Sequence, residues 1–363
     1  MEKKSLGDIC EIVTGATPKT NIKEFWDGDI NWITPAELTE DTYIINESLR
    51  KITTEGVEKT GLKSFPKGTV ILSSRAPIGK VAIAGCEMYC NQGFKNLVCS
   101  KQINNRFLYW YLKGHKEYLN SLGRGATFKE ISKAIVENIE ICLPTLEKQE
   151  KYADILEQCN GIIQIKKGQL RKLDTLVKSR FVEMFGDPVA NDKEWTTLPL
   201  EEACKTIVDC PHSTPSYTTE NTGFMCIRTS IVKKNKILWD DIEYIPEDEF
   251  IKRIQRKKPE IGDVVYTREG AILGIAAIID RECNVALGQR SMLLSPDANK
   301  CLSEFLCVAM NCDSFLDNAL KGIAGSASPH INVGDIKSFK MIMPPIELQN
   351  QFADFVQQVD KSK

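Results

Sequence analysis

Polar side chains suited to binding nucleic-acid bases recur in both halves of this 363-residue chain, next to predicted strands and turns. Base edges are recognised by hydrogen-bonding side chains, such as those that loops hold beside a rigid sheet. The candidates in the first half are Thr17, Lys19, Thr20, Ser74, Arg75, Asn91, Gln92, Lys95, Arg124 and Thr127. Those in the second half are His212, Ser213, Thr214, Arg228, Thr267, Arg268, Gln289, Arg290, Ser326, Ser328 and His330. An Arg can bind guanine through two hydrogen bonds, and a Gln can bind adenine in the same way.

Each candidate also has an ordinary structural explanation, which the sequence leaves open. Arg268 could form an ion pair with a neighbour such as Glu269. Gln92 could cap backbone groups in a hairpin, and a loop histidine such as His212 is more often a local hydrogen-bond partner. The glycines near residues 123–130 would let the backbone approach a phosphate closely.

The sequence lacks the motifs that catalysis on DNA or nucleotides would need. An amino-methyltransferase holds its flipped base with Asn/Asp-Pro-Pro-Tyr/Phe, and residues 343–346 read Met-Pro-Pro-Ile, without either polar end. Nucleotide hydrolysis needs a glycine-rich phosphate loop ending in Gly-Lys-Ser/Thr, and residues 79–81 read Gly-Lys-Val. With three histidines and no nucleophile elbow, we expect no catalytic residues.

Composition narrows the class of protein further. The thirteen cysteines show no Cys-x-x-Cys spacing, and Cys86, Cys90 and His115 lack the paired spacing of a zinc site, so we expect no metal. Unpatterned cysteines and the lack of an export signal favour reduced thiols and a cytoplasmic location. No apolar run is long enough to cross a membrane. The net charge of −2 argues against a protein that coats DNA, but permits basic residues gathered on one face.

An internal repeat organises the chain. Residues 144–149 (PTLEKQ) match residues 344–349 (PPIELQ) at an offset of 200, and the helical sequence that follows each also matches. Gly68 and Gly262, each before a β-branched run, match at an offset of 194, as loop insertions would produce. Such a long period indicates a duplicated domain, and proteins with duplicated readers contact two half-sites.

Each repeat mixes strands and helices without strict alternation, which predicts an α+β fold. In the first half, turns at 65–68 and 76–79 flank strands at 69–73 and 80–84, and a helix follows at 107–122. The second half repeats this with strands at 264–267 and 275–279 and a helix at 305–320.

A long helix is predicted between the repeats, over residues 147–185, where there is no proline. A heptad column of apolar residues predicts packing against another helix. The column is Leu156, Ile163, Leu170, Val177 and Met184. Gly186-Asp187-Pro188 ends this helix, and a second, shorter one starts at Pro345.

Several motifs, in this order and duplicated, resemble the specificity subunit of type I restriction–modification enzymes. Residues 6–9 (LGDI) with 14–18 (TGATP), and residues 209–215 (DCPHSTP), look like openings of its target-recognition domains. Residues 144–149 and 344–349 look like the Pro-x-x-Glu-x-Gln start of its spacer helices, and residues 181–188 (FVEMFGDP) like the end of its central helix.

The resemblance implies two similar mixed α/β target-recognition domains in tandem, at 1–143 and 188–343. It implies a coiled-coil spacer helix at 144–187 and a shortened second spacer at 344–363. Each domain would read half of a split DNA sequence for two methyltransferase subunits, which use S-adenosylmethionine to methylate adenine. Motor-nuclease subunits could join this complex to make the restriction enzyme. This chain itself would bind no cofactor and be non-catalytic.

Here the second spacer is shorter than the family pattern, which suggests that another copy or another chain completes the long helix. Two other classes of protein stay open at this point. A catalytic DNA-modifying enzyme would bind S-adenosylmethionine or a metal by itself. A coiled-coil scaffold unrelated to DNA would bind no duplex even with partners present.

Overall fold

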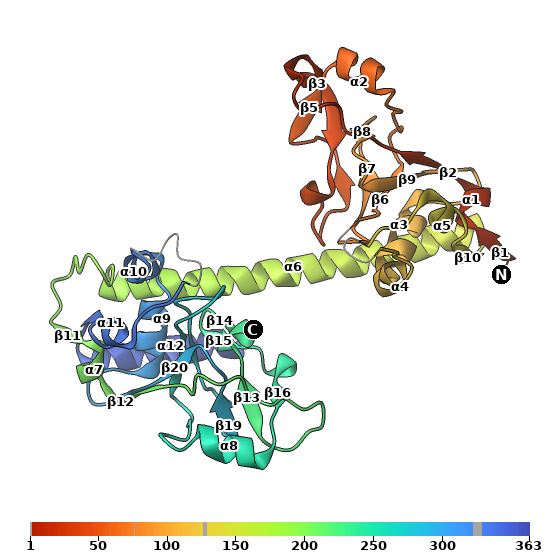
Figure 1. Cartoon of the computed structure of the whole chain (residues 1–363). Coiled ribbons are helices and arrows are strands. Elements are labelled where there is room, and N and C mark those ends of the chain that lie inside the picture. The colour runs from red at the N-terminus through yellow and green to blue at the C-terminus, as the bar shows by residue number, and fades with distance from the viewer. Residues whose placement is uncertain (1, 76, 126–128, 322–328) are drawn as a thin grey trace. The chain divides into compact units, whose positions relative to one another are not determined.

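The computed structural model describes residues 2–75, 77–125, 129–321 and 329–363. Contacts divide the chain into two units, Met1–Ile165 and Lys166–Lys363, and the dividing point lies within helix α6 (Leu146–Phe185). Each unit is built from several small sheets with short helices against them (Figure 1). In the described part of the chain, no helix is long and apolar enough to cross a membrane.

The first unit contains a five-stranded sheet of order β2-β9-β6-β7-β4 and a three-stranded sheet of order β5-β3-β8. The strands of the larger sheet are β2 (Cys10–Thr14), β9 (Phe94–Cys99), β6 (Val70–Ser73), β7 (Val81–Ala84) and β4 (Ile44–Ile45). Those of the smaller sheet are β5 (Arg50–Ile52), β3 (Trp26–Ile33) and β8 (Tyr89–Cys90). β1 (Glu2–Ser5) pairs with β10 (Glu140–Leu143). The helices are α1 (Leu6–Ile9), α2 (Thr54–Thr60), α3 (Asn105–Gly114), α4 (Lys116–Ser121) and α5 (Lys133–Glu137).

Strand alternation in β6 sends its side chains into two different hydrophobic clusters of the first unit. Val70 and Leu72 on β6 pack in one cluster with Leu108 of α3, whereas Ile71 between them packs in another with Phe65. Successive side chains of a strand point to opposite faces, so β6 needs apolar residues at each position. All four of its residues are buried, which explains the unbroken apolar run in the sequence.

The second unit repeats this arrangement with its own sheets. The larger has the order β12-β20-β17-β18, and the smaller β16-β13-β19. The strands are β12 (Cys204–Asp209), β20 (Ser291–Pro296), β17 (Val264–Thr267), β18 (Ala276–Ile278), β16 (Glu243–Tyr244), β13 (Met225–Ile227) and β19 (Val285–Leu287). Two further pairs are β11 (Thr197–Pro199) with β21 (Lys340–Ile342), and β14 (Val232–Lys233) with β15 (Lys236–Ile237). The helices are α7 (Leu200–Ala203), α8 (Glu247–Arg253), α9 (Ser303–Met310), α10 (Asp313–Ala319), α11 (Val333–Lys337) and α12 (Ile346–Lys361).

The predicted duplication is confirmed by matching hydrogen bonds. Gly68 and Gly262 both adopt positive φ, +88° and +89°. The amide of Gly68 donates to Ala84 at the end of β7, and that of Gly262 donates to Ile279, directly after β18. The order of strands in the smaller sheet is also the same, with one antiparallel and one parallel neighbour for the central strand. One ancestral module therefore accounts for both units.

The predicted helices at 107–122 and 305–320 are each two helices, which corrects the sequence prediction. In the first unit the break lies at His115, whose Nδ1 lies 2.7 Å from the carbonyl oxygen of Tyr111. In the second unit it lies at Asn311, whose buried amide bonds both backbone groups of Ala276 (3.1 and 2.8 Å). Local side-chain contacts interrupt helices whose apolar spacing continues across the break.

The predicted long helix is confirmed as α6, which has 40 residues, and the shorter one as α12, which has 16. Val177 and Met184 of the heptad column pack in the core of the second unit. Leu156, Ile163 and Leu170 are 40–51% exposed. Packing of these three against a further helix stays a prediction.

A fully buried glutamine fixes the start of each long helix. The Gln149 amide accepts from the backbone of Asn104 (2.8 Å) and donates to the carbonyls of Gln102 (3.1 Å) and Pro144 (2.9 Å). In the second unit, Gln349 accepts from Leu302 and donates to Lys300 and Pro344, each at 2.9 Å. The glutamine of the repeated motif therefore ties the helix to the segment before α3 or α9.

We expect Gln149→Met to lower the free energy of unfolding of the first unit by about 3 kcal/mol. The methionine has a similar volume, but three buried backbone groups would lose their partner. Chemical denaturation measures the change. The matched control is Gln158→Met, at an exposed position of the same helix. Equal stability of the two variants would contradict a structural role for the buried amide.

Candidate nucleic-acid interface

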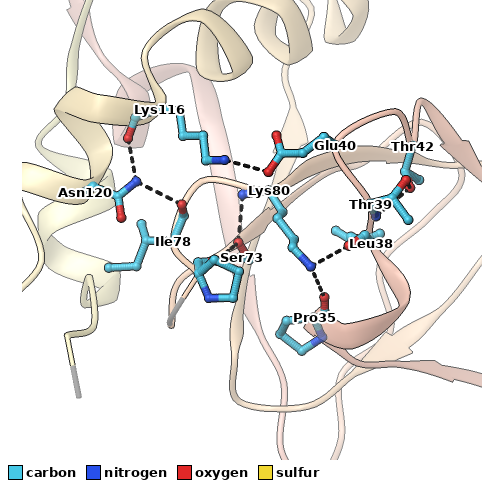
Figure 2. Close-up of polar contacts among 11 residues, drawn as sticks. Pro35, Leu38, Thr39, Glu40, Thr42, Ser73, Ile78, Lys80, Lys116 and Asn120 are labelled. Carbon is cyan, nitrogen blue, oxygen red and sulfur yellow. Dashed lines mark hydrogen bonds and ion pairs between the residues drawn. The ribbon is translucent and has the colours of Figure 1, made fainter. Parts of the chain in front are cut away.

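In the first unit, the turn after β6 carries the candidate Arg75 and is held from both sides. The hydroxyl of Ser73 accepts from the backbone of Lys80 (2.8 Å) and donates to the Pro77 carbonyl (2.8 Å). Asn120 of α4 donates to Ile78 (3.1 Å), and the Lys80 ammonium group donates to the carbonyls of the segment after β3 (Figure 2). Ser73, Ile78 and Lys80 are therefore held in place on either side of this turn.

An ion-pair network lies at the base of this turn. Glu130 accepts from Arg75 (2.9 Å) and from Lys95 (3.3 Å), and Lys95 also donates to Ser74 (3.1 Å). Burial raises the pKa of Glu130, but the hydrogen bonds from Arg75 and Lys95 outweigh it and leave the pKa below its usual value. The network has one carboxylate for two cations, and the Arg75 side chain is 46% exposed. A surplus positive charge therefore lies at the surface.

The second unit has a different network at the corresponding place. Amides at Ile131 and Ile331 donate to the carbonyls of Ser74 and Arg268, so Arg268 corresponds to Ser74 rather than to Arg75. Its guanidinium group is 8% exposed and bonds both carboxylate oxygens of Asp209, at 2.9 and 3.3 Å. The same carboxylate lies 3.1 Å from the ring of His212. The exposed imidazole is therefore anchored to a buried ion pair.

A threonine–glutamine pair occurs once in each unit, at the same sequence separation. Thr17 donates to the amide oxygen of Gln92 at 2.6 Å, and Thr214 to that of Gln289 at 3.3 Å. Each glutamine follows the parallel neighbour of the central strand, and the amide just before it donates to that strand, at Ile33 or Ile227. One lone pair and the NH2 group of each amide stay available, which is the set that binds an adenine edge.

Some candidates are buried and support the loops from beneath. Thr267 caps the turn after β17 by accepting from Ile275 (2.9 Å), as Ser73 does in the first unit. The side chains in this group have protein partners in the unbound chain, and their contact with DNA stays a prediction. They are Ser74, Lys95, Thr267 and Arg268.

Other candidates lie at the surface or partly so. Asn91 caps the backbone of Gly93 (2.9 Å), Arg228 forms an ion pair with Glu243, and Ser213 accepts from the buried Arg253 (2.8 and 3.2 Å). Arg290 is exposed and has φ +75°, at the position that corresponds to Gly93. The side chains of Lys19, Thr20, Arg124 and His330 are exposed. Thr127, Ser326 and Ser328 lie outside the described residues.

The sequence did not reveal the charged partners that position the candidates. Glu130, Asp209 and Arg253 are 35 to 59 residues away from the groups that they hold, apart from Asp209 and His212, and no local pattern marks them. Arg50 was also missed, although two tryptophans of the same segment contact it. Aromatic residues before an isolated arginine were the one available signal.

Metal or redox chemistry finds no support among the described residues. They contain no group of three or more histidine, cysteine, aspartate or glutamate side chains that could hold a metal ion. All thirteen cysteines are free thiols. Burial raises the pKa of the Cys90 and Cys204 thiols to about 12, so both stay protonated at neutral pH.

Comparison with known proteins decides the family. A family model described as the type I restriction modification DNA specificity domain matches residues 1–175 and 192–363. The chain belongs to this family. It directs DNA target recognition in a type I restriction–modification system and is itself non-catalytic.

Named relatives agree with this assignment. The MjaIX specificity subunit of Methanocaldococcus jannaschii is 30% identical over 98% of this chain and 85% of its own length. The EcoKI specificity subunit of Escherichia coli K12 is 22% identical over 83% of this chain and 69% of its own.

Solved structures show the same fold. The type I S subunit from M. genitalium superimposes with a TM-score of 0.50 at 16% identity, covering 99% of this chain and 89% of that one. A chain from a structural study of assembly and conformational transition of the type I system has a TM-score of 0.51 at 18% identity, covering 99% and 90%. The predicted α+β class with two similar domains is confirmed.

We expect the two strand-end arginines to differ in their effect on stability. Arg268→Met would leave Asp209, at 15% exposure, with only the exposed His212 ring beside it, and we expect the free energy of unfolding to fall by about 3 kcal/mol. Arg75→Met removes a partly exposed ion pair, and we expect a loss of under about 1 kcal/mol. Chemical denaturation compares the two. A larger loss of unfolding free energy for Arg75→Met than for Arg268→Met would contradict the finding that the Arg268 ion pair is the more buried of the two.

Proposed function

We propose that each unit of this specificity subunit reads one half of a split DNA target. The first target-recognition domain would comprise residues 1–143, and the second residues 188–343. The single observation that carries this proposal is the duplicated threonine–glutamine pair, Thr17 with Gln92 and Thr214 with Gln289. In both units it places an oriented amide beside candidate arginine, lysine or histidine side chains.

The threonine hydroxyl orients the glutamine amide before DNA binds. A free glutamine side chain rotates about three bonds, and ordering it on DNA would cost side-chain entropy. The hydrogen bond from Thr17 holds the oxygen of Gln92 in the free chain and leaves its NH2 group for the N7 acceptor of adenine. The remaining lone pair of the oxygen can accept from the adenine amino group.

The surrounding loops would supply the sequence-independent part of binding. Lys19, Thr20 and Arg124 are exposed donors of the kind that bind phosphates. Duplex DNA bound by the two units would be methylated on adenine by two methyltransferase subunits, which hold S-adenosylmethionine. Motor-nuclease subunits would complete the restriction enzyme. The spacer at 144–187 would set the distance between half-sites.

We expect Gln92→Leu and Gln289→Leu to affect different halves of the target. Leucine has a similar size but forms no hydrogen bonds, so each variant should relax one adenine-containing position by about 1–3 kcal/mol. Methylated adenines are mapped in cells that contain the methyltransferase subunit and either variant.

The control is Gln158→Leu, at an exposed position of α6. Loss of one half-site in one variant and of the other half-site in the second supports the proposal. An unchanged sequence logo for both variants would reject the assigned role of the pair. Methylation that does not depend on this chain would reject the function itself.

We propose that a second copy covers the apolar side chains of α6 that the first unit leaves exposed. Five apolar residues between positions 155 and 165 are 42–62% exposed: Ile155, Leu156, Ile162, Ile163 and Ile165. Such a row on one helix calls for a partner helix. α12 packs on the other end of α6, where Phe352 lies 5.6 Å from Phe181 and Lys363 lies 2.8 Å from Asp174. An antiparallel second α6 would be self-complementary over this stretch.

We expect Ile163→Glu to convert a dimer to a monomer, because a buried carboxylate between two helices would be desolvated without a partner. Sedimentation at increasing concentration measures the change, with Glu150→Gln, at an exposed position on the opposite side of the helix, as control. A wild-type chain that stays monomeric, or that dimerises equally well as the variant, would reject this arrangement in favour of docking by a different subunit.

A further inference from the structure

Arg50 of β5 has an unusual environment in the smaller sheet of the first unit. Its guanidinium carbon lies 3.8 Å above the centre of the Trp26 ring and 5.7 Å from that of Trp32. Among the described residues, the guanidinium has neither a hydrogen bond nor an ion pair, and the side chain is exposed. All five of its N–H donors are therefore available to a ligand.

The tryptophan platform beneath Arg50 is rigid. Trp26 and Trp32 are buried and contact each other edge to face, with ring centres 5.1 Å apart. A bulge in β3 sets both Trp26 and Ile30 opposite Ile52 of β5, whereas Trp32 pairs with Arg50 itself. The bulge lies so close to β5 that a Cβ at Gly28 would lie 2.4 Å from the Ile52 carbonyl oxygen. Stacking on such a platform fixes the plane of a guanidinium group.

The backbone at Arg50 is also fixed. The buried hydroxyl of Ser48 donates to the Arg50 carbonyl (2.6 Å) and accepts from the amide of Trp32 (2.9 Å). The neighbouring Leu49 exposes 88% of its surface, while its amide donates to Glu37 (2.7 Å). A free cation and an apolar side chain are thus presented together by an ordered segment, which is the usual composition of a contact surface for bases.

The same platform carries the loop of the threonine–glutamine pair. The indole of Trp32 donates to the carbonyl of Ala16 (3.0 Å), and that of Trp26 to the carbonyl of Lys19 (3.2 Å). Thr17 lies between these two anchors and bonds Gln92. Arg50 and Gln92 are therefore linked through the tryptophan platform and residues 16–19.

The second unit has the opposite charge at this position. Arg50 pairs in register with Trp32, and Glu243 pairs in register with Cys226, the corresponding residue of the central strand. Glu243 forms an ion pair with Arg228, which stacks near Tyr217 at 5.2 Å. In that unit the guanidinium group has a carboxylate partner, whereas in the first unit it has none.

We propose that Arg50 is a specificity-determining residue that binds a guanine edge in the first half-site. This inference rests on the proposed function of the unit as a DNA reader. A phosphate contact needs charge but no fixed plane, whereas the paired acceptors of guanine need the planar fork in one orientation. Stacking on Trp26 provides that orientation before DNA binds, beside the amide that we assign to adenine.

The experiment compares Arg50→Ala, Arg50→Lys and Lys59→Ala in the complex of the full chain with its methyltransferase subunit. Lys59 is an exposed cation of α2 in the same unit and serves as the matched control for charge. Binding-site selection from a random duplex library gives the sequence logo. Titration of the selected duplex and of an unrelated duplex at several salt concentrations gives affinity and its salt dependence.

We expect Arg50→Ala and Arg50→Lys to lose the preference for guanine at one position, with affinity for the selected duplex on the order of 10-fold to 100-fold lower. The other half-site and the affinity for unrelated DNA should change little. Lysine keeps the charge but not the fork, so failure of Arg50→Lys to restore the preference separates base reading from simple attraction.

Two outcomes would overturn the inference while leaving the proposed function intact. An unchanged logo and affinity would show that Arg50 does not contact DNA. A uniform loss on all sequences, with a smaller salt slope and rescue by lysine, would assign Arg50 to a phosphate. Absence of sequence-selective binding by the wild-type complex would instead reject the proposed function. Thermal unfolding of each variant confirms that the first unit is folded.

Discussion

The structure depends on one buried amide in each unit. Gln149 and Gln349 saturate three backbone groups where a strand-rich unit meets its long helix, and they do so with the same bonds. A buried amide without hydrogen-bond partners would lower the free energy of unfolding by more than the first turn of the helix contributes. The contact therefore fixes where each helix starts. A reading module and its spacer therefore behave as one folded element.

Beyond this shared contact, the two units hold their helices differently. In the first, Arg106 of α3 bonds Asp154 at 2.6 Å and also Glu157, both on α6. The hydrogen bond from Arg106 lowers the pKa of Glu157 against the opposing effect of burial. In the second, Phe181 and Phe185 pack against Phe305 with ring centres 5.5 and 4.9 Å apart. A polar clamp suits a partly exposed helix, and an aromatic cluster suits a buried one.

The sequence predicted the architecture, but it did not predict which contacts hold the candidate side chains. The matching PTLEKQ and PPIELQ strings, the apolar runs at 70–73 and 264–267, and the heptad column all predicted elements that the structure contains. Local patterns carry this information, because periodicity and turn residues act over a few positions. The breaks at His115 and Asn311 were missed, since tertiary contacts of single side chains cause them.

The ion networks were missed for a related reason. Which arginine is buried depends on a carboxylate far along the chain: Arg75 meets Glu130, whereas Arg268 meets Asp209. Both arginines follow a predicted strand in the sequence, but hydrogen bonding places Arg268 opposite Ser74 rather than opposite Arg75. Loops vary more than the elements that they connect, so similarity of residue type is a poor guide to equivalence there.

The unequal networks imply an order of events during encounter with a duplex. Arg75, Lys95 and Glu130 sum to one positive charge in the first unit, and Arg50 adds another, whereas Arg268 with Asp209 and Arg228 with Glu243 are neutral pairs in the second. Long-range attraction to a polyanion falls with counter-ion screening and grows with local charge. If both units bind DNA as proposed, these groups favour first contact of the polyanion with the first unit.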